Sequence, residues 1–176
     1  MSKFDFIEKY KVDENICDDL LEYYKSNKEY KCPKIGVSNT TEVYFFNLST
    51  DKRILNFFEM ISKHVSEYIA KYDIVDTLST SMTNHIQHYS ANTGYFNLHY
   101  ERHYSSIGRQ LVYMLYLNTV KDKGGTEFPY QQKTFSATKG DLLIWPADFT
   151  HPHRGIVSPT EEKYIATGWF ELVQSD

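Results

Sequence analysis

Four of the seven histidines lie in two close pairs, His99 with His103 and His151 with His153. Glu101 stands between the members of the first pair. On an extended strand, side chains at positions i and i+2 point to the same face, so His99 and Glu101 would converge on one point. A further histidine from a distant strand would complete a two-histidine, one-carboxylate face, which holds Fe(II) and leaves its other coordination positions open. The spacing therefore predicts a metal site.

The segment His-Pro-His at 151–153 is the expected source of the third ligand. Both of its histidines would face the same way on an extended chain. At this point the residues leave either His151 or His153 as the partner of the first pair.

Helical periodicity dominates the part of the chain before residue 80. Asp13 is a plausible N-cap for a helix, and a second helix is expected after Asp51. Each carries an apolar stripe at helical spacing, formed by Ile16, Leu20, Leu21 and Tyr24 in the first and by Ile54, Phe57, Phe58, Ile61, Val65, Tyr68 and Ile69 in the second. Residues 41–46 between them have the composition of a strand.

From residue 81 onward the pattern changes to short strands separated by turn residues. We expect strands at 83–89, 95–101, 110–118, 133–136, 141–146, 150–157 and 163–172. Strands of this length and spacing favour a sandwich or squat barrel. The predicted fold is mainly β with flanking helices (α+β), in one domain over 1–176. Residues 1–80 would form a helical support region packed outside, and 81–176 the β core with the metal site.

Composition narrows the class of protein. With 176 residues, 41% hydrophobic and 24% charged, the chain is long and apolar enough for one folded core. The formal net charge of −4 gives no broad positive field for nucleic acid. No apolar run approaches the ~20 residues that span a bilayer, and the first residues carry no signal-peptide pattern. Cys17 and Cys32 lack metal-type spacing, so we expect two thiols in a reducing cytoplasm.

Five ordered segments between residues 89 and 172 resemble one known family, the iron(II)- and 2-oxoglutarate-dependent dioxygenases, in particular their prolyl-4-hydroxylase-like branch. These segments are Tyr89–Glu101, Arg109–Asn118, Gly124–Phe128, Lys139–Pro146, and the spaced residues His153, Lys163 and Trp169. The resemblance implies a double-stranded β-helix, or jelly roll, with the active site at its mouth. It also implies Fe(II), 2-oxoglutarate and O2 as cofactor and co-substrates, with ascorbate as a further possibility.

The resemblance also implies roles for individual residues. His99, Glu101 and His153 would bind the iron, and Lys163 would pair with the distal carboxylate of 2-oxoglutarate. Thr167 and Trp169 lie on the same strand face as Lys163, and the Thr167 hydroxyl could bond the same carboxylate. Further co-substrate contacts are expected from Tyr89 and Tyr116.

Two features depart from the family pattern. Glu101 stands where aspartate is usual, and its extra methylene would place iron slightly further from the strand. The distal histidine is also ambiguous, because counting forward from Pro146 favours His151, whereas counting back from Lys163 favours His153. We favour His153, since a turn after Pro146 can absorb an insertion.

The resemblance predicts an oxygenase that hydroxylates a peptidyl proline or a small molecule and releases succinate and CO2. Arg102, His103 and Arg109 could contact the substrate, and Gln87 could line the pocket, whereas His85 and His88 are expected to be structural. Two alternatives remain: a cupin-type metal enzyme without 2-oxoglutarate, which would have no use for Lys163, and a non-catalytic binding or sensor protein on the same fold. The oligomeric state is not predicted.

Overall fold

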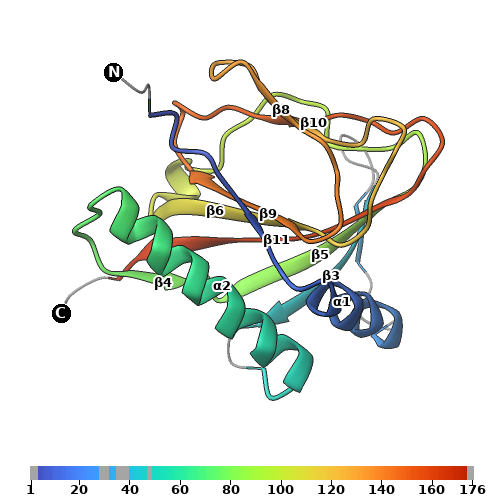
Figure 1. The fold of residues 1–176 in the computed structure, drawn as a ribbon, viewed down its shortest axis with the longest axis horizontal. Coiled ribbons are helices and arrows are strands. Elements are labelled where there is room, and N and C mark those ends of the chain that lie inside the picture. The colour runs from blue at the N-terminus through green and yellow to red at the C-terminus, as the bar shows by residue number, and fades with distance from the viewer. Residues whose placement is uncertain (1–3, 28–31, 35–39, 47–48, 174–176) are drawn as a thin grey trace.

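Two β-sheets lie one above the other, and two helices cover the outer face of the larger sheet (Figure 1). The computed structural model describes residues 4–27, 32–34, 40–46 and 49–173. The helices are α1 (Glu14–Ser26) and α2 (Lys52–Lys71), with a short 3-10 helix, η2 (Tyr104–Ser106). The strands are β1 (Glu8–Lys11), β2 (Cys32–Lys34), β3 (Thr40–Phe46), β4 (Leu78–Thr80), β5 (Thr83–Tyr89), β6 (Arg109–Tyr116), β7 (Thr126–Phe128), β8 (Lys133–Phe135), β9 (Asp141–Pro146), β10 (Arg154–Gly155) and β11 (Lys163–Leu172).

The larger sheet has the strand order β1-β9-β6-β11-β5-β3-β2, with β4 paired to β11 beside this path. The smaller sheet has the order β10-β7-β8. All the pairings are antiparallel. Two facing antiparallel sheets whose neighbours are mostly distant in sequence agree with the predicted jelly roll core and flanking helices.

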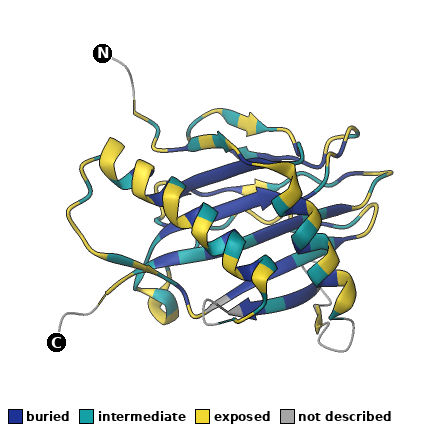
Figure 2. Cartoon of the chain, turned by 60° about the horizontal axis from the view of Figure 1, so that its bottom comes forward, coloured by how far each residue is buried: buried dark blue, intermediate teal, exposed yellow. Residues whose placement is uncertain are grey.

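Both helices begin where the sequence predicted. The Asp13 side chain accepts a hydrogen bond from the backbone N–H of Asn15, and Asp51 accepts one from Arg53, so each helix has an aspartate N-cap. Figure 2 shows that α2 turns its buried face to the sheet and its exposed face outward. The buried side of α2 consists of Ile54, Phe57, Ile61, Val65 and Tyr68, as the helical spacing predicts.

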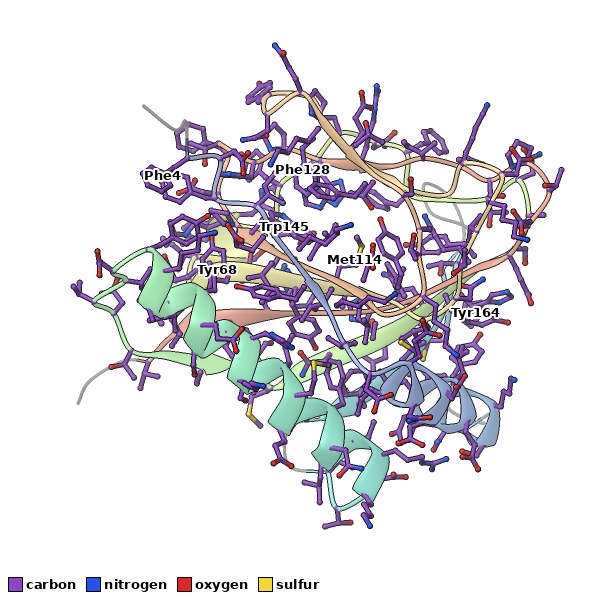
Figure 3. The ribbon with its side chains drawn as sticks, in the orientation of Figure 1. Phe4, Tyr68, Met114, Phe128, Trp145 and Tyr164 are labelled. Carbon is purple, nitrogen blue, oxygen red and sulfur yellow. The ribbon has the colours of Figure 1, made fainter. Side chains whose placement is uncertain are left out.

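A second apolar core fills the space between the two sheets. It includes Met114 from β6, Phe128 from β7 and Trp145 from β9, and Figure 3 labels these side chains between the ribbons. Trp145 and Phe128 meet edge to face, with 5.3 Å between their ring centroids. Two residues of this core, Met114 and Trp145, also line the cavity of the candidate site.

The N-terminal region contributes more than helices. Four strands from before residue 81 join the larger sheet, where β1 pairs with β9, β3 with β5, and β4 with β11, while β2 pairs with β3. The sheet therefore crosses the boundary that the change of periodicity suggested at residue 80. No helix in the described part of the chain combines the length and the apolar character needed to cross a membrane.

Two of the expected strands have a different form. The predicted strand 95–101 is a loop that makes one isolated bridge, between His99 and His153. The predicted strand 150–157 is reduced to β10, which has two residues. In place of a continuous ladder, the loop makes separate backbone bonds at Tyr95, His99 and Glu101 to residues between Ala147 and Gly155.

Candidate metal centre

The bridge between His99 and His153 brings the two histidine segments together. The backbone N–H of His99 donates to the carbonyl of His153 at 3.0 Å, and the N–H of His153 donates back at 2.8 Å. Two residues later, the N–H of Glu101 donates to the carbonyl of Ala147 at 3.0 Å. These three backbone bonds hold the loop against the chain that follows β9, so the backbone that carries His99 and Glu101 is fixed in position.

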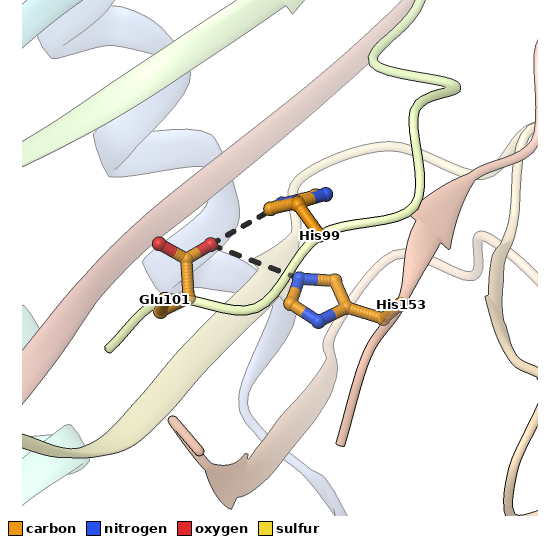
Figure 4. A group of neighbouring side chains, drawn as sticks. All are labelled: His99, Glu101 and His153. Atoms are coloured by element: carbon orange, nitrogen blue, oxygen red, sulfur yellow. Dashed lines mark ion pairs between the residues drawn. The ribbon is translucent and has the colours of Figure 1, made fainter. Parts of the chain in front are cut away.

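The side chains of His99, Glu101 and His153 meet at one point (Figure 4). One potential ligand atom from each lies within 4.8 Å of the others. Oε1 of Glu101 lies 3.4 Å from Nε2 of His99 and 3.7 Å from Nε2 of His153. The loop therefore directs His99 and Glu101 to the same side, as expected for an extended strand, although it makes only one bridge.

Hydrogen bonds to the backbone fix which ring nitrogen each histidine offers. Nδ1 of His99 bonds the carbonyl of Asn97 at 2.9 Å, and Nδ1 of His153 bonds the carbonyl of His151 at 3.2 Å. Because a carbonyl oxygen only accepts hydrogen bonds, Nδ1 carries the proton in both rings. Nε2 then carries the lone pair, and in both rings it faces Glu101.

The electrostatics of the three groups suit a cation. Burial tends to raise the pKa of Glu101, but its contacts with His99, His153 and Arg109 outweigh burial and lower it to about 2. Burial lowers the pKa of His153 to about 4. At neutral pH the group thus contains an ionised carboxylate and a neutral imidazole, which are the forms that bind a metal. Two imidazole nitrogens and one carboxylate oxygen on one face are a donor set that fits Fe(II).

His151 lies outside this group. Its Nε2 bonds the carbonyl of Asp5 at 2.8 Å and its Nδ1 bonds the hydroxyl of Thr150 at 2.9 Å. Both ring nitrogens are therefore occupied, and the bond to Asp5 fastens the N-terminal segment to the chain that follows β9. The structure brings His153, and not His151, to His99 and Glu101.

The three side chains open into a cavity of about 220 Å³ between the two sheets. Lys163 lines the same cavity and is 6% exposed. Its Nζ donates to the carbonyl of Gly124 at 3.0 Å and lies 5.1 Å from the centre of the Tyr89 ring. Burial lowers the pKa of Lys163 to about 8. Among the described residues no carboxylate lies within ion-pair distance of this ammonium group, so the cavity contains a buried cation suited to an anionic ligand.

Of the four other residues predicted to contact the co-substrate, three line the cavity and Tyr116 does not. Tyr89, Thr167 and Trp169 line the cavity with Lys163. The Thr167 hydroxyl donates to the carbonyl of Tyr113 at 2.8 Å, and the Tyr89 hydroxyl donates to Gln87 at 2.6 Å. The hydroxyl of Tyr116 is buried 2.7 Å from that of Thr126, which itself lines the cavity.

Some lining residues were not singled out by sequence reasoning. His85, expected to be structural, lines the cavity beside Gln87, and the fully buried Glu42 accepts a hydrogen bond from Gln87 at 2.9 Å. Tyr95 meets the His99 ring edge to face at 4.3 Å. The alternation of β5 gave a signal for His85, since it shares a face with Gln87. The predicted strand 95–101 likewise places Tyr95 on the face of His99, whereas Glu42 had no such signal.

Comparison with known proteins agrees with this geometry. The family model described as the 2OG-Fe(II) oxygenase superfamily matches residues 84–171, which is half of the chain. The chain belongs to this superfamily. Its enzymes use Fe(II), 2-oxoglutarate and O2, for which the His-Glu-His group provides a suitable donor set. No curated protein matches the sequence.

Solved structures show the same fold. A viral collagen prolyl hydroxylase from Paramecium Bursaria Chlorella virus-1, in complex with 2OG, has a TM-score of 0.73 at 18% identity, covering 96% of this chain and 97% of that one. A prolyl-4-hydroxylase from Pseudomonas putida has a TM-score of 0.73 at 14% identity, covering 96% and 94%. A Trichoplax adhaerens prolyl hydroxylase, bound to a hypoxia inducible factor peptide, has a TM-score of 0.74 at 12% identity, covering 95% and 84%. The chain therefore has the double-stranded β-helix fold of prolyl hydroxylases.

Proposed function

We propose that this superfamily member is a hydroxylase in which His99, Glu101 and His153 hold Fe(II) and Lys163 binds 2-oxoglutarate. The observation that carries the proposal is one cavity that joins the three convergent ligand atoms to a buried ammonium group without a carboxylate partner among the described residues. A dicarboxylate with a keto group satisfies both, because one end can chelate a metal while the other neutralises the lysine. A cupin-type enzyme without 2-oxoglutarate gives no reason to bury Lys163.

The overall reaction is balanced by the keto acid. One oxygen atom of O2 enters the substrate as a hydroxyl group, and the other enters succinate as 2-oxoglutarate loses CO2. Bound Fe(II) supplies the oxygen chemistry that no amino-acid side chain provides. The chain's own residues orient the two ligands, direct Nε2 of both histidines to one point, and surround the reaction with the apolar walls of Val112, Met114, Trp145 and Ile165.

We propose a peptide as the substrate, and peptidyl proline as the first residue to test. The loop that carries His99 and Glu101 exposes four large apolar side chains, Phe96, Leu98, Tyr104 and Ile107, which are 56%, 49%, 99% and 71% exposed. An apolar surface next to a cavity is typical of a binding face for another chain. The structural neighbours include a collagen prolyl hydroxylase and one bound to a peptide, which makes proline peptides the first candidates.

The test is succinate formation from 2-oxoglutarate with Fe(II) under air, with and without proline-containing peptides. We expect a slow uncoupled rate in the wild type, a faster rate with a substrate peptide, and a mass gain of one oxygen atom in that peptide. His99→Ala should abolish both rates, whereas His64→Ala, which removes an imidazole of α2 that does not line the cavity, should leave them unchanged. Equal succinate traces in the wild type and His99→Ala would refute the enzymatic proposal. Coupling to a small metabolite instead of any peptide would refute the choice of substrate alone.

A further inference from the structure

The two oxygens of the Glu101 carboxylate have different surroundings. Oε1 faces the imidazole nitrogens of His99 and His153 at 3.4 and 3.7 Å. Oε2 accepts two hydrogen bonds, from Nε1 of Trp169 at 3.2 Å and from Nη1 of Arg109 at 3.2 Å. One oxygen is thus directed to the candidate metal position, and the other is occupied by protein donors.

Arg109 also bonds the backbone of the residue whose side chain it holds. Its Nη1 lies 3.3 Å from the carbonyl oxygen of Glu101, so the same nitrogen bridges the backbone and the side chain of that residue. Arg109 therefore holds the carboxylate of Glu101 and its backbone carbonyl at the same time.

The two donors, Arg109 and Trp169, also contact each other. The guanidinium carbon of Arg109 lies 3.5 Å from the centre of the Trp169 ring, a stacked cation–π contact. Arg109 begins β6 and Trp169 lies in β11, and these strands are paired over most of their length. Glu171 on β11 adds a distant counter-charge, with its Oε1 3.9 Å from Nε of Arg109. Both donors therefore stand on rigid neighbouring strands and not on the loop that carries Glu101.

We propose that Arg109 and Trp169 are positioning residues that hold Oε2 of Glu101, so that this longer carboxylate offers the metal Oε1 alone. The proposal rests on the proposed role of Glu101 as a metal ligand and extends it. Glutamate has one more rotatable bond than aspartate, so a free Glu101 would lose more conformational entropy on binding and could also bind through both oxygens. Two fixed donors on Oε2 remove that freedom before the metal arrives. Partners of this kind orient metal ligands in many proteins.

The test measures the affinity of the metal-free protein for Mn(II) by isothermal titration calorimetry, without O2 or substrate. Arg109→Met removes one donor and keeps an apolar side chain, and Trp169→Phe removes the other and keeps an aromatic ring. We expect each to weaken Mn(II) binding by about 10- to 100-fold, the usual effect of losing a partner of a metal ligand. Arg53→Met is the matched control, since Arg53 also pairs with a carboxylate and stacks on a tyrosine, but on α2. It should bind Mn(II) as the wild type does.

A double-mutant cycle separates positioning from a general loss of structure. Aspartate is shorter by one methylene, so in Glu101→Asp the carboxylate loses its reach to Arg109 and Trp169. Arg109→Met should then cost less than about threefold in the Glu101→Asp background, although it costs about 10-fold or more alone. Arg109→Lys, which keeps a donor, should recover part of the affinity.

The outcomes distinguish this proposal from the proposed function. Wild-type Mn(II) affinity in both Arg109→Met and Trp169→Phe would overturn the positioning role, even if the enzyme makes succinate. Equal losses for Arg109→Met in the wild-type and Glu101→Asp backgrounds would also overturn it. Weakened Mn(II) binding confined to the two variants would support it, even if no hydroxylation is found. A wild type that binds no Mn(II) would overturn both proposals.

Discussion

Replacing Lys163 by methionine should change protein stability and ligand binding in opposite directions. Lys163 is buried, with a single carbonyl partner and the Tyr89 ring beside it. Its pKa falls from the usual 10.5 to about 8 because burial disfavours the charged form. At about 1.36 kcal/mol per pKa unit, this drop corresponds to a cost of about 3 kcal/mol for keeping the charge in the cavity.

Methionine has a similar length and no charge, so Lys163→Met should remove this cost from the unliganded protein. We expect its free energy of unfolding at pH 7 to equal that of the wild type or to exceed it by up to about 3 kcal/mol. The same change leaves the distal carboxylate of 2-oxoglutarate without a cation, which should cost about 3 kcal/mol of binding. That loss is about 100-fold in the dissociation constant.

The assay pairs urea unfolding with calorimetric titration of 2-oxoglutarate into the Mn(II)-loaded protein. Lys71→Met is the control, because Lys71 pairs with Glu8 on the surface and should affect neither measurement by more than about 1 kcal/mol. Unchanged affinity for 2-oxoglutarate in Lys163→Met would refute the role of this lysine. A variant that loses stability would contradict the inference that its charge is held at a cost.

The same geometry and the apolar core lead to three further predictions. His153→Ala should abolish Mn(II) binding, whereas His151→Ala should bind Mn(II) within about 10-fold of the wild type. His151→Ala should instead loosen the N-terminal segment, which amide exchange near Asp5 would show as a faster rate. Loss of metal binding in His151→Ala alone would contradict the assignment. Between pH 8 and 10.5 the folded protein loses the Lys163 proton before the unfolded chain does, so this group makes the free energy of unfolding rise with pH. Over the same range, affinity for 2-oxoglutarate should fall by up to about 10-fold per pH unit, because the ligand loses its cation. A flat affinity profile over that range would refute this titration. Phe57→Ala should lower the free energy of unfolding by about 3–5 kcal/mol, because it opens a hole between α2 and the sheet, and a loss below about 1 kcal/mol in urea unfolding would contradict the packing.

The regular elements were predictable because local signals agree with the tertiary structure. The two aspartate N-caps and the apolar stripes located both helices. Strands β5, β9 and β11 have the predicted bounds, since turn residues lie beside them and β9 and β11 are also rich in apolar side chains. By contrast, β1 is four residues with the charged pattern Glu-Lys-Tyr-Lys, and it is a strand because it pairs with the edge of β9. Pairing of that kind is set by the rest of the fold, not by the segment.

The site was predictable where the spacing is local. His99 and Glu101 are two residues apart, so any extended backbone brings them to one side, even the loop found here. The choice between His151 and His153 depended on how the chain turns after Pro146, which short-range pattern leaves open. The contacts of Arg109 and Trp169 with Glu101 depend on the register of β6 against β11 and had no signal in the sequence.

The most direct test of the account is a crystal structure of the protein with Mn(II) and 2-oxoglutarate, prepared without O2. We predict that the metal lies within about 2.3 Å of Nε2 of His99, Oε1 of Glu101 and Nε2 of His153, with the distal carboxylate of the keto acid at Nζ of Lys163. A metal held by His151, or a keto acid whose distal carboxylate lies away from Lys163, would contradict it.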